Sequence, residues 1–81
     1  MYLLYTINVN GDIYKRRVVE GEKASLKYLN YLEEKGKQDF SRFNGLKCKS
    51  KMNYLKFSFV NDNYDYIEHV YELKEEDEEY E

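Results

Sequence analysis

The sequence predicts an α+β domain in which one helix packs on a four-stranded, mainly antiparallel sheet, in the chain order ββαββ. Three observations predict this class. Apolar residues alternate with a period of two before and after residues 22–35, whereas inside that stretch they recur every three or four positions. Two Asn-Gly pairs and the triplet Asn61-Asp62-Asn63 separate the stretches, as turns do. Because 81 residues form one domain, we place it at residues 1–73, followed by an acidic tail at residues 74–81 that we expect to be mobile.

The first two strands, at residues 2–9 and 12–19, are expected to form a hairpin around Asn10-Gly11. Asn and Gly most easily accept the positive φ angles that both central residues of a type I′ turn require. A loop of only these two residues gives the register Ile7–Tyr14, Tyr5–Arg16 and Leu3–Val18. One face of the hairpin would then be apolar, formed by Leu3, Ile7, Tyr14 and Val18.

Residues 22–35 have the spacing of an amphipathic helix. The stripe at i, i+3, i+4 and i+7 consists of Ser25, Tyr28, Leu29 and Leu32. Glu22 suits the first turn of this helix, and Gly36 suits the C′ position after its last turn. Phe40 and Phe43 lie three residues apart, which is compatible with one more helical turn packed under the sheet.

Residues 46–60 are expected to form the third strand, with Leu55, Phe57 and Phe59 on its buried face. The parity of the apolar positions shifts near residues 50–53, which predicts a β-bulge there. Residues 64–73 are expected to form the fourth strand, with Ile67, Tyr71 and Leu73 facing inward. A three-residue loop between these strands would pair Phe57 with Ile67, and Lys56 with Glu68.

Charge and cysteine content restrict the partners and the compartment. Residues 72–81 contain seven acidic side chains and one lysine, a net charge of −6, whereas residues 1–71 have a net charge of +3. This polarity bears on partners rather than on the fold. Cys48 is the only cysteine, so no internal disulfide is expected, and the apolar start Met1-Tyr2-Leu3-Leu4 is too short and too alternating to predict a signal peptide or a membrane span. We therefore expect a cytoplasmic protein.

No residue pattern predicts catalysis, a metal site or a cofactor. His69 is expected to point toward the core or its edge, with no serine or cysteine beside it, so packing explains it better than catalysis. Cys48 lies between Lys47 and Lys49, which would lower the pKa of its thiol, but a buried and inert cysteine is the better interpretation. One cysteine and one histidine cannot complete a tetrahedral zinc site. We therefore expect a protein that is not an enzyme.

The first functional hypothesis is a protein-binding module that occludes or regulates a larger partner with a basic surface. The chain has ten tyrosines, which give contact area at little entropic cost, and its acidic tail can engage a groove that normally receives nucleic acid. This small, acidic, proline-free composition is similar to that of phage and mobile-element products that block host or defence enzymes. In its sharpest form, the hypothesis is an anti-CRISPR-like inhibitor of a nuclease. The candidate contact residues are Tyr64, Tyr66, Glu72, Glu75, Glu76, Asp77, Glu78, Glu79 and Tyr80.

The alternative is a regulator that binds nucleic acid, acting like the first as a monomer or a homodimer. Lysines at every second position of residues 47–51 line one face of an extended strand, where phosphate neutralisation and aromatic stacking can hold a single strand. Lysines on an edge strand also deter strand addition, and the acidic tail opposes polyanion binding, so we prefer the first hypothesis. The candidate residues of the alternative are Lys15, Arg16, Arg17, Lys47, Lys49, Lys51 and Tyr54.

Overall fold

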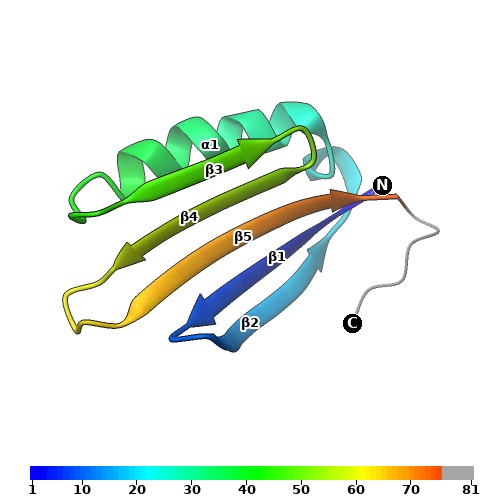
Figure 1. Ribbon diagram of the computed structural model, residues 1–81. Helices are drawn as coiled ribbons and strands as arrows, with labels where there is room; N and C mark the ends of the chain where they lie inside the picture. The colour runs from blue at the N-terminus through cyan, green and yellow to red at the C-terminus, as the bar shows by residue number, and fades with distance from the viewer. Residues whose placement is uncertain (76–81) are drawn as a thin grey trace.

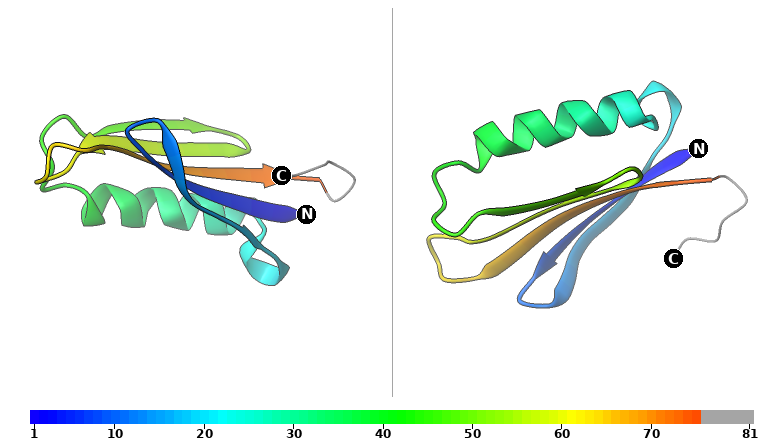
Figure 2. Two further views of the ribbon diagram at one scale, coloured as in Figure 1. Left: turned by 90° about the horizontal axis from the view of Figure 1, so that it is seen from below. Right: turned by 45° about the horizontal axis from the view of Figure 1, so that its top comes forward.

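The computed structural model describes residues 1–75 and consists of one antiparallel sheet with one α-helix packed on it (Figure 1). The five strands are β1 (Tyr2–Val9), β2 (Asp12–Val19), β3 (Lys47–Lys51), β4 (Tyr54–Val60) and β5 (Tyr66–Lys74). Their spatial order is β2-β1-β5-β4-β3, so the last strand of the chain is the central one. A short 3-10 turn, η1 (Gly21–Lys23), precedes the helix α1 (Leu26–Asp39). Figure 2 shows that α1 lies on one side of the sheet only.

The prediction of an α+β fold is confirmed, but the sheet has five strands rather than four. The predicted third strand is two strands, because the chain reverses at Met52-Asn53 and Lys51 pairs with Tyr54. The parity shift near residues 50–53 therefore marks a hairpin, and the predicted bulge there is wrong. The sheet also extends to Lys74, one residue into the stretch predicted as tail, while residues 76–81 lie outside the described part of the chain.

The first hairpin turns at Asn10-Gly11 as predicted, with φ angles of 53° and 91°. The predicted register is wrong beyond the turn, because a bulge opposite Ile7 and Asn8 shifts the pairing by one residue. Tyr14 is the extra residue of the bulge, and the observed pairs are Ile7–Lys15, Tyr5–Arg17 and Leu3–Val19. A shift of one residue moves every later side chain to the other face of the sheet. Val19 rather than Val18 therefore packs toward the core, and Tyr14 leaves the predicted apolar face.

The helix begins later and ends later than predicted, at Leu26 and Asp39. Ser25 is not part of the apolar stripe but the N-cap, because its Oγ accepts a hydrogen bond from the backbone N–H of Tyr28 at 3.1 Å. Gly36 is not the C′ residue but a buried position inside the last turns of the helix. A Cβ atom at this position would overlap the ring of Phe57, so the missing side chain allows helix and sheet to approach closely.

The core lies between α1 and the sheet, and its buried residues are Leu3, Ala24, Leu29, Leu55, Phe57 and Leu73. The inward orientation predicted for β4 and β5 is confirmed, but the predicted pairing of Phe57 with Ile67 is wrong. The loop between these strands has five residues instead of three, so Phe57 lies opposite His69. Phe40 and Phe43, directly after the helix, extend the core by ring contacts with Phe57 and Phe59.

Candidate functional site

The most unusual backbone position lies at the tip of the β4–β5 loop, where Tyr64 has a φ angle of 64°. Left-handed backbone costs about 1–2 kcal/mol for a residue with a Cβ atom, and it is rare for a bulky side chain. The side chain does not compensate for this cost by packing, because Tyr64 is 90% exposed. The loop thus presents a large aromatic ring to solvent from a strained position, as functional sites often do.

Asn61 fixes the conformation of this loop. Its Oδ1 accepts hydrogen bonds from the backbone N–H groups of Asn63 at 2.9 Å and Asp65 at 3.0 Å. Its own backbone N–H donates to the carbonyl of Asp65, and its carbonyl accepts from the N–H of Tyr64. With both ends of the turn bonded to one residue, the position of Tyr64 is defined by the loop itself.

A second asparagine ties this loop to the tip of the first hairpin. Asn10 accepts a hydrogen bond at Oδ1 from the backbone N–H of Tyr66 at 2.8 Å and donates from Nδ2 to Asp65 at 2.9 Å. Its backbone N–H also donates to the carbonyl of Tyr66 at 2.8 Å. The two turns, 55 residues apart in sequence at Asn10 and Asp65, therefore form one end of the sheet.

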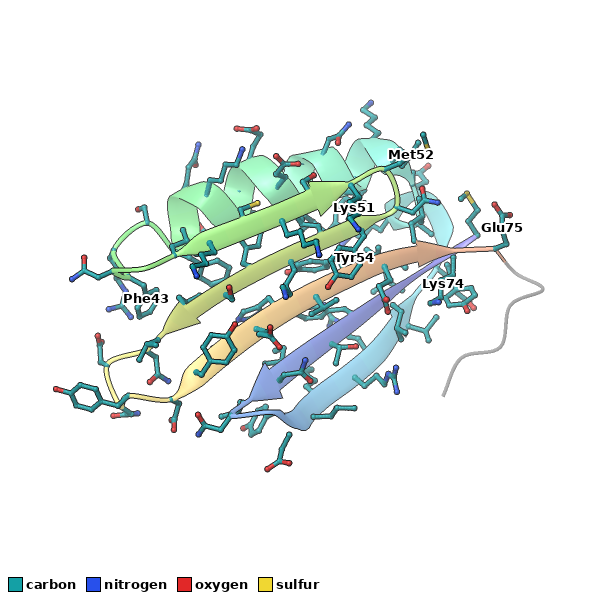
Figure 3. The ribbon with its side chains drawn as sticks, in the orientation of Figure 1. Phe43, Lys51, Met52, Tyr54, Lys74 and Glu75 are labelled. Atoms are coloured by element: carbon teal, nitrogen blue, oxygen red, sulfur yellow. The ribbon has the colours of Figure 1, made fainter. Side chains whose placement is uncertain are left out.

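Three further exposed apolar side chains lie toward this end of the sheet. We call the set the loop-end surface; it comprises Ile13, Val60, Tyr64 and Tyr66. A shallow hollow of about 360 Å³ adjoins it, between Tyr64, Val60 and Phe43, the last of which is labelled in Figure 3. Exposed aromatic and branched side chains held by hydrogen-bonded turns are typical of protein interfaces.

The remaining predicted contact residues do not lie at the loop-end surface. Glu72 and Glu75 lie at the opposite end of β5 from Tyr66, and six residue steps along a strand, from Tyr66 to Glu72, span about 20 Å. Residues 76–79 and Tyr80 lie outside the described residues. The structure thus separates the predicted tyrosines from the predicted carboxylates that it describes.

The lysines predicted for nucleic-acid binding share the face of the sheet that carries no helix. Lys47, Lys49 and Lys51 lie opposite Ser58, Lys56 and Tyr54 of β4, and Figure 3 shows Lys51 and Tyr54 projecting from neighbouring strands. We call Lys47, Lys49, Lys51, Tyr54 and Lys56 the basic face. Lys56 forms an ion pair of 3.3 Å with Glu68, whereas the three lysines of β3 are exposed.

The second predicted basic cluster is divided between the two faces of the sheet. Arg16 lies opposite Thr6 on the helix-free face, while Lys15 and Arg17 lie opposite Ile7 and Tyr5 on the helix face. Adjacent residues of a strand point to opposite faces, so a run of three cations cannot act as one patch.

His69 points to the helix face as predicted, but with a partner that the sequence did not indicate. Its Nδ1 lies 2.7 Å from the hydroxyl of Tyr5, and its ring stacks on that of Phe40 at 4.9 Å. Burial lowers the pKa of His69 below its ordinary value, so the neutral imidazole accepts the hydrogen bond from Tyr5. The strand register, which places the two residues on adjacent strands, creates this contact.

Cys48 is exposed, and the prediction of a buried cysteine is wrong. Lys47 and Lys49 point to the other face of β3, so they do not activate the thiol. Partial desolvation and the carboxylate of Glu33 instead raise the pKa of Cys48. Raised pKa values disfavour the reactive thiolate.

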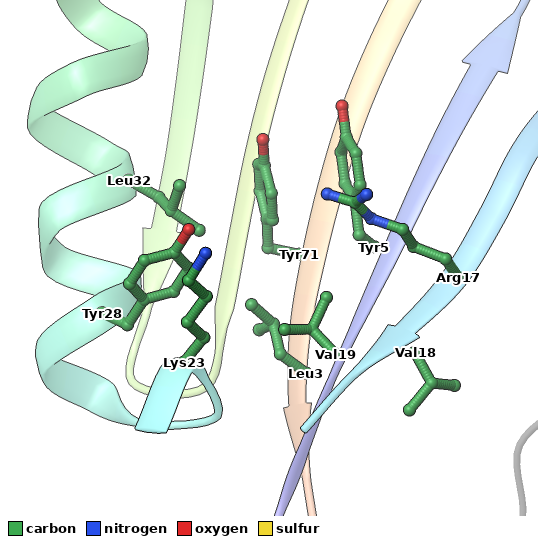
Figure 4. A pocket seen from close by; sticks show the side chains of 9 residues that line it. All are labelled: Leu3, Tyr5, Arg17, Val18, Val19, Lys23, Tyr28, Leu32 and Tyr71. Carbon is green, nitrogen blue, oxygen red and sulfur yellow. The ribbon is translucent and has the colours of Figure 1, made fainter. Parts of the chain in front are cut away.

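A groove that the sequence did not indicate lies on the helix face, beside β1 and β2, where α1 does not cover the sheet (Figure 4). Its volume is about 390 Å³, and it extends from Tyr28 of α1 across Tyr71 and Tyr5 to Arg17 of β2. Burial raises the pKa of Tyr71 far above its ordinary value and also raises that of Tyr5, so both hydroxyls are neutral at neutral pH. Arg17 reaches this groove only because of the bulge in the first hairpin.

Within residues 1–75, no three His, Cys, Asp or Glu side chains gather closely enough to hold a metal ion. No helix of the described chain has both the length and the apolar character to cross a membrane. The chain matches no protein-family model, and its comparison with curated proteins and with solved structures finds no match.

Proposed function

We propose that this chain is a non-enzymatic protein-binding module that engages its partner through the loop-end surface. The observation that carries this proposal is Tyr64, a bulky side chain in left-handed backbone, exposed to 90% and fixed by the hydrogen bonds of Asn61. Because the hydrogen bonds of Asn61 already fix the backbone at Tyr64, a partner that covers its ring orders only a side chain with two rotatable bonds, at little entropic cost. The left-handed backbone at Tyr64 would then destabilise the free fold slightly in return for exposing the ring to a partner.

The partner that fits best is a larger protein with a basic surface, as in an anti-CRISPR-like inhibitor of a nuclease acting in the cytoplasm. Five consecutive acids, residues 75–79, supply the complementary charge. A partner that touches both these acids and Tyr64 would span the length of β5, about 25–30 Å at the rise of a strand. An interface of ordinary size, about 800 Å² on each protein, can reach that far.

The test is capture of partners by the immobilised chain from a nuclease-treated lysate of its source cells. The Tyr64→Ala variant should retain at least tenfold less of the captured protein, a loss of about 1.4 kcal/mol or more. The matched control is Tyr31→Ala, since Tyr31 of α1 is 55% exposed and lies outside the loop-end surface. Equal capture by the Tyr64→Ala variant and the native chain would contradict the proposal.

The charge of the acidic run is tested separately from Tyr64. Replacing Glu76, Asp77, Glu78 and Glu79 by their amides removes four negative charges without shortening the chain. We expect weaker capture and a loss of its salt dependence, because rim charges mainly accelerate association at low salt. Capture that is unchanged would restrict the interface to the loop end.

A second candidate function is the binding of single-stranded nucleic acid by the basic face. The specific observation is the register of β3 and β4, which gathers Lys47, Lys49, Lys51 and Tyr54 on the helix-free face. Neutralising about three phosphates would give binding to an oligo-dT strand with a log–log salt slope of about −2. The Lys49→Gln variant should reduce that slope by about 0.7, while Lys35→Gln on α1 should leave it unchanged. Salt-independent or undetectable binding would exclude this candidate.

A further inference from the structure

We propose that the groove beside β1 and β2 is a binding site for a small organic anion that combines a flat aromatic ring with a phosphate or carboxylate, such as a nucleoside monophosphate. This inference is independent of the proposed function, because the groove shares no residue with the loop-end surface or the basic face. Its volume of about 390 Å³ lies within the range of small-molecule sites, about 300–1,000 Å³.

The walls of the groove are aromatic and its floor is apolar. Figure 4 shows Tyr28 of α1 on one side and the rings of Tyr71 and Tyr5 on the other, with Leu3 and Val19 below Tyr71 and Tyr5. The rings of Tyr5 and Tyr71 are stacked, with centroids 4.6 Å apart and planes 6° from parallel. A flat ring entering the groove beside Tyr28 and Tyr71 would meet aromatic surface, which favours aromatic over aliphatic ligands.

Two cations stand at opposite sides of the groove. The guanidinium carbon of Arg17 lies 5.4 Å from the centre of the Tyr5 ring, and Nζ of Lys23 lies 5.7 Å from the centre of the Tyr28 ring. No carboxylate lines the groove, and neither cation forms an ion pair within residues 1–75. Other cations of the chain do pair, as Lys37 does with Glu33 and Lys56 with Glu68. The charge of Arg17 and Lys23 therefore remains available to an anion.

The polar groups of the groove select for a ligand that accepts hydrogen bonds. The hydroxyls of Tyr28, Tyr71 and Tyr5 point toward the same side of the groove in Figure 4. Tyr5 already interacts with His69, and Tyr71 hydrogen-bonds to Tyr5, so Tyr28 is the hydroxyl left to donate to a ligand. Arginine, lysine and neutral tyrosine are all donors, and together they match the oxygen atoms of a phosphate or carboxylate.

Titration calorimetry with AMP, phenyl phosphate, adenosine and inorganic phosphate tests the site. AMP and phenyl phosphate should bind at least tenfold more tightly than adenosine or phosphate alone. Adenosine lacks the anionic group, and inorganic phosphate lacks the aromatic ring. An oligonucleotide with a 5′-phosphate distinguishes a free nucleotide from a strand end as the natural source. If AMP binds and the oligonucleotide does not, the ligand is a free small molecule. If both bind equally, the same site takes a strand terminus.

Variants of the groove locate the binding. Arg17→Gln and Lys23→Gln should each weaken AMP binding about tenfold, the effect of losing one charge-assisted hydrogen bond. Lys27→Gln is the matched control, since Lys27 is an exposed lysine of α1 that does not line the groove. Tyr28→Leu keeps an apolar side chain in the wall but removes its ring and hydroxyl, and should weaken AMP more than inorganic phosphate. Absence of AMP and phenyl phosphate binding at about 10 mM, or binding that neither cation affects, would overturn the proposal.

Discussion

The hydroxyl of Tyr5 in β1 lies 2.7 Å from Nδ1 of His69 in β5, and the two rings are stacked with centroids 5.9 Å apart. The neighbouring pair Tyr5–Tyr71 continues the stack toward the groove. The only histidine of the chain is thus part of the packing between helix and sheet, with its proton-accepting nitrogen already occupied. This arrangement explains why His69 is neutral, and it makes the stability of the fold depend on pH.

The first prediction concerns this dependence. Burial lowers the pKa of His69 in the folded protein below its ordinary value of 6.5, so at acid pH the unfolded chain binds the proton first. The free energy of unfolding should therefore fall as the pH falls from 6.5 toward the lowered value, and be unaffected by His69 above about pH 7.5. Urea denaturation of the native chain and the His69→Gln variant, at intervals between about pH 8 and pH 5, measures this difference. Parallel pH profiles for the two proteins would contradict it.

The second prediction concerns the effect of Tyr64 on the stability of the fold, which can be measured separately from its proposed role in partner binding. Replacing Tyr64 by glycine relieves the left-handed backbone and should leave the fold equally stable or raise its stability by up to about 1 kcal/mol, whereas the proposed function predicts that partner binding is lost. The matched control is Tyr66→Gly, at the first position of β5, where φ is negative. That variant should lose about 0.5–1 kcal/mol, because glycine in a strand costs entropy without relieving strain. Thermal denaturation of both variants gives the comparison, and a Tyr64→Gly variant that is less stable than Tyr66→Gly would refute the strain at Tyr64.

The third prediction concerns the junction of the two turns at Asn10. The Asn10→Gly variant keeps the positive φ angle but loses the hydrogen bonds to Tyr66 and Asp65, and should cost about 1–2 kcal/mol. Asn10→Ala adds the left-handed backbone penalty and should cost about 1–2 kcal/mol more. Chemical denaturation of the two variants measures each contribution separately. Equal stability of the native chain and Asn10→Gly would mean that these side-chain bonds contribute nothing.

The fourth prediction concerns the contact between helix and sheet at Gly36. Gly36→Ala improves helix propensity by about 1 kcal/mol, yet the new methyl group would overlap the ring of Phe57, which is only 1% exposed and cannot move aside. We expect a net loss of about 1–2 kcal/mol. Asn30→Ala on the exposed side of α1 is the control and should be neutral or stabilising.

A double-mutant cycle assigns this loss to the contact itself. In a Phe57→Leu background the smaller side chain leaves room for the methyl group, so Gly36→Ala should cost less than in the native chain. An undiminished cost in that background would place the origin of the loss elsewhere in the helix.

Several features of this protein follow from local sequence alone. The turn at Asn10-Gly11, the helical character of residues 26–35 and the inward orientation of Leu55, Phe57 and Phe59 were all predictable. These features depend on backbone sterics and on the period of the apolar positions, which neighbouring residues determine. The exposed tyrosine of the β4–β5 loop was also a candidate from composition, although its strained backbone was not predictable.

The tertiary structure decided the features that depend on pairing. The bulge at Tyr14 and the reversal at Met52-Asn53 are choices between arrangements of similar local energy, and only packing of the whole sheet against α1 distinguishes them. One extra residue at the bulge places Arg17 beside Tyr5 and so forms the groove, whereas the regular hairpin would point Arg17 to the other face. Local sequence thus determined which elements form, and the register between strands determined which side chains meet.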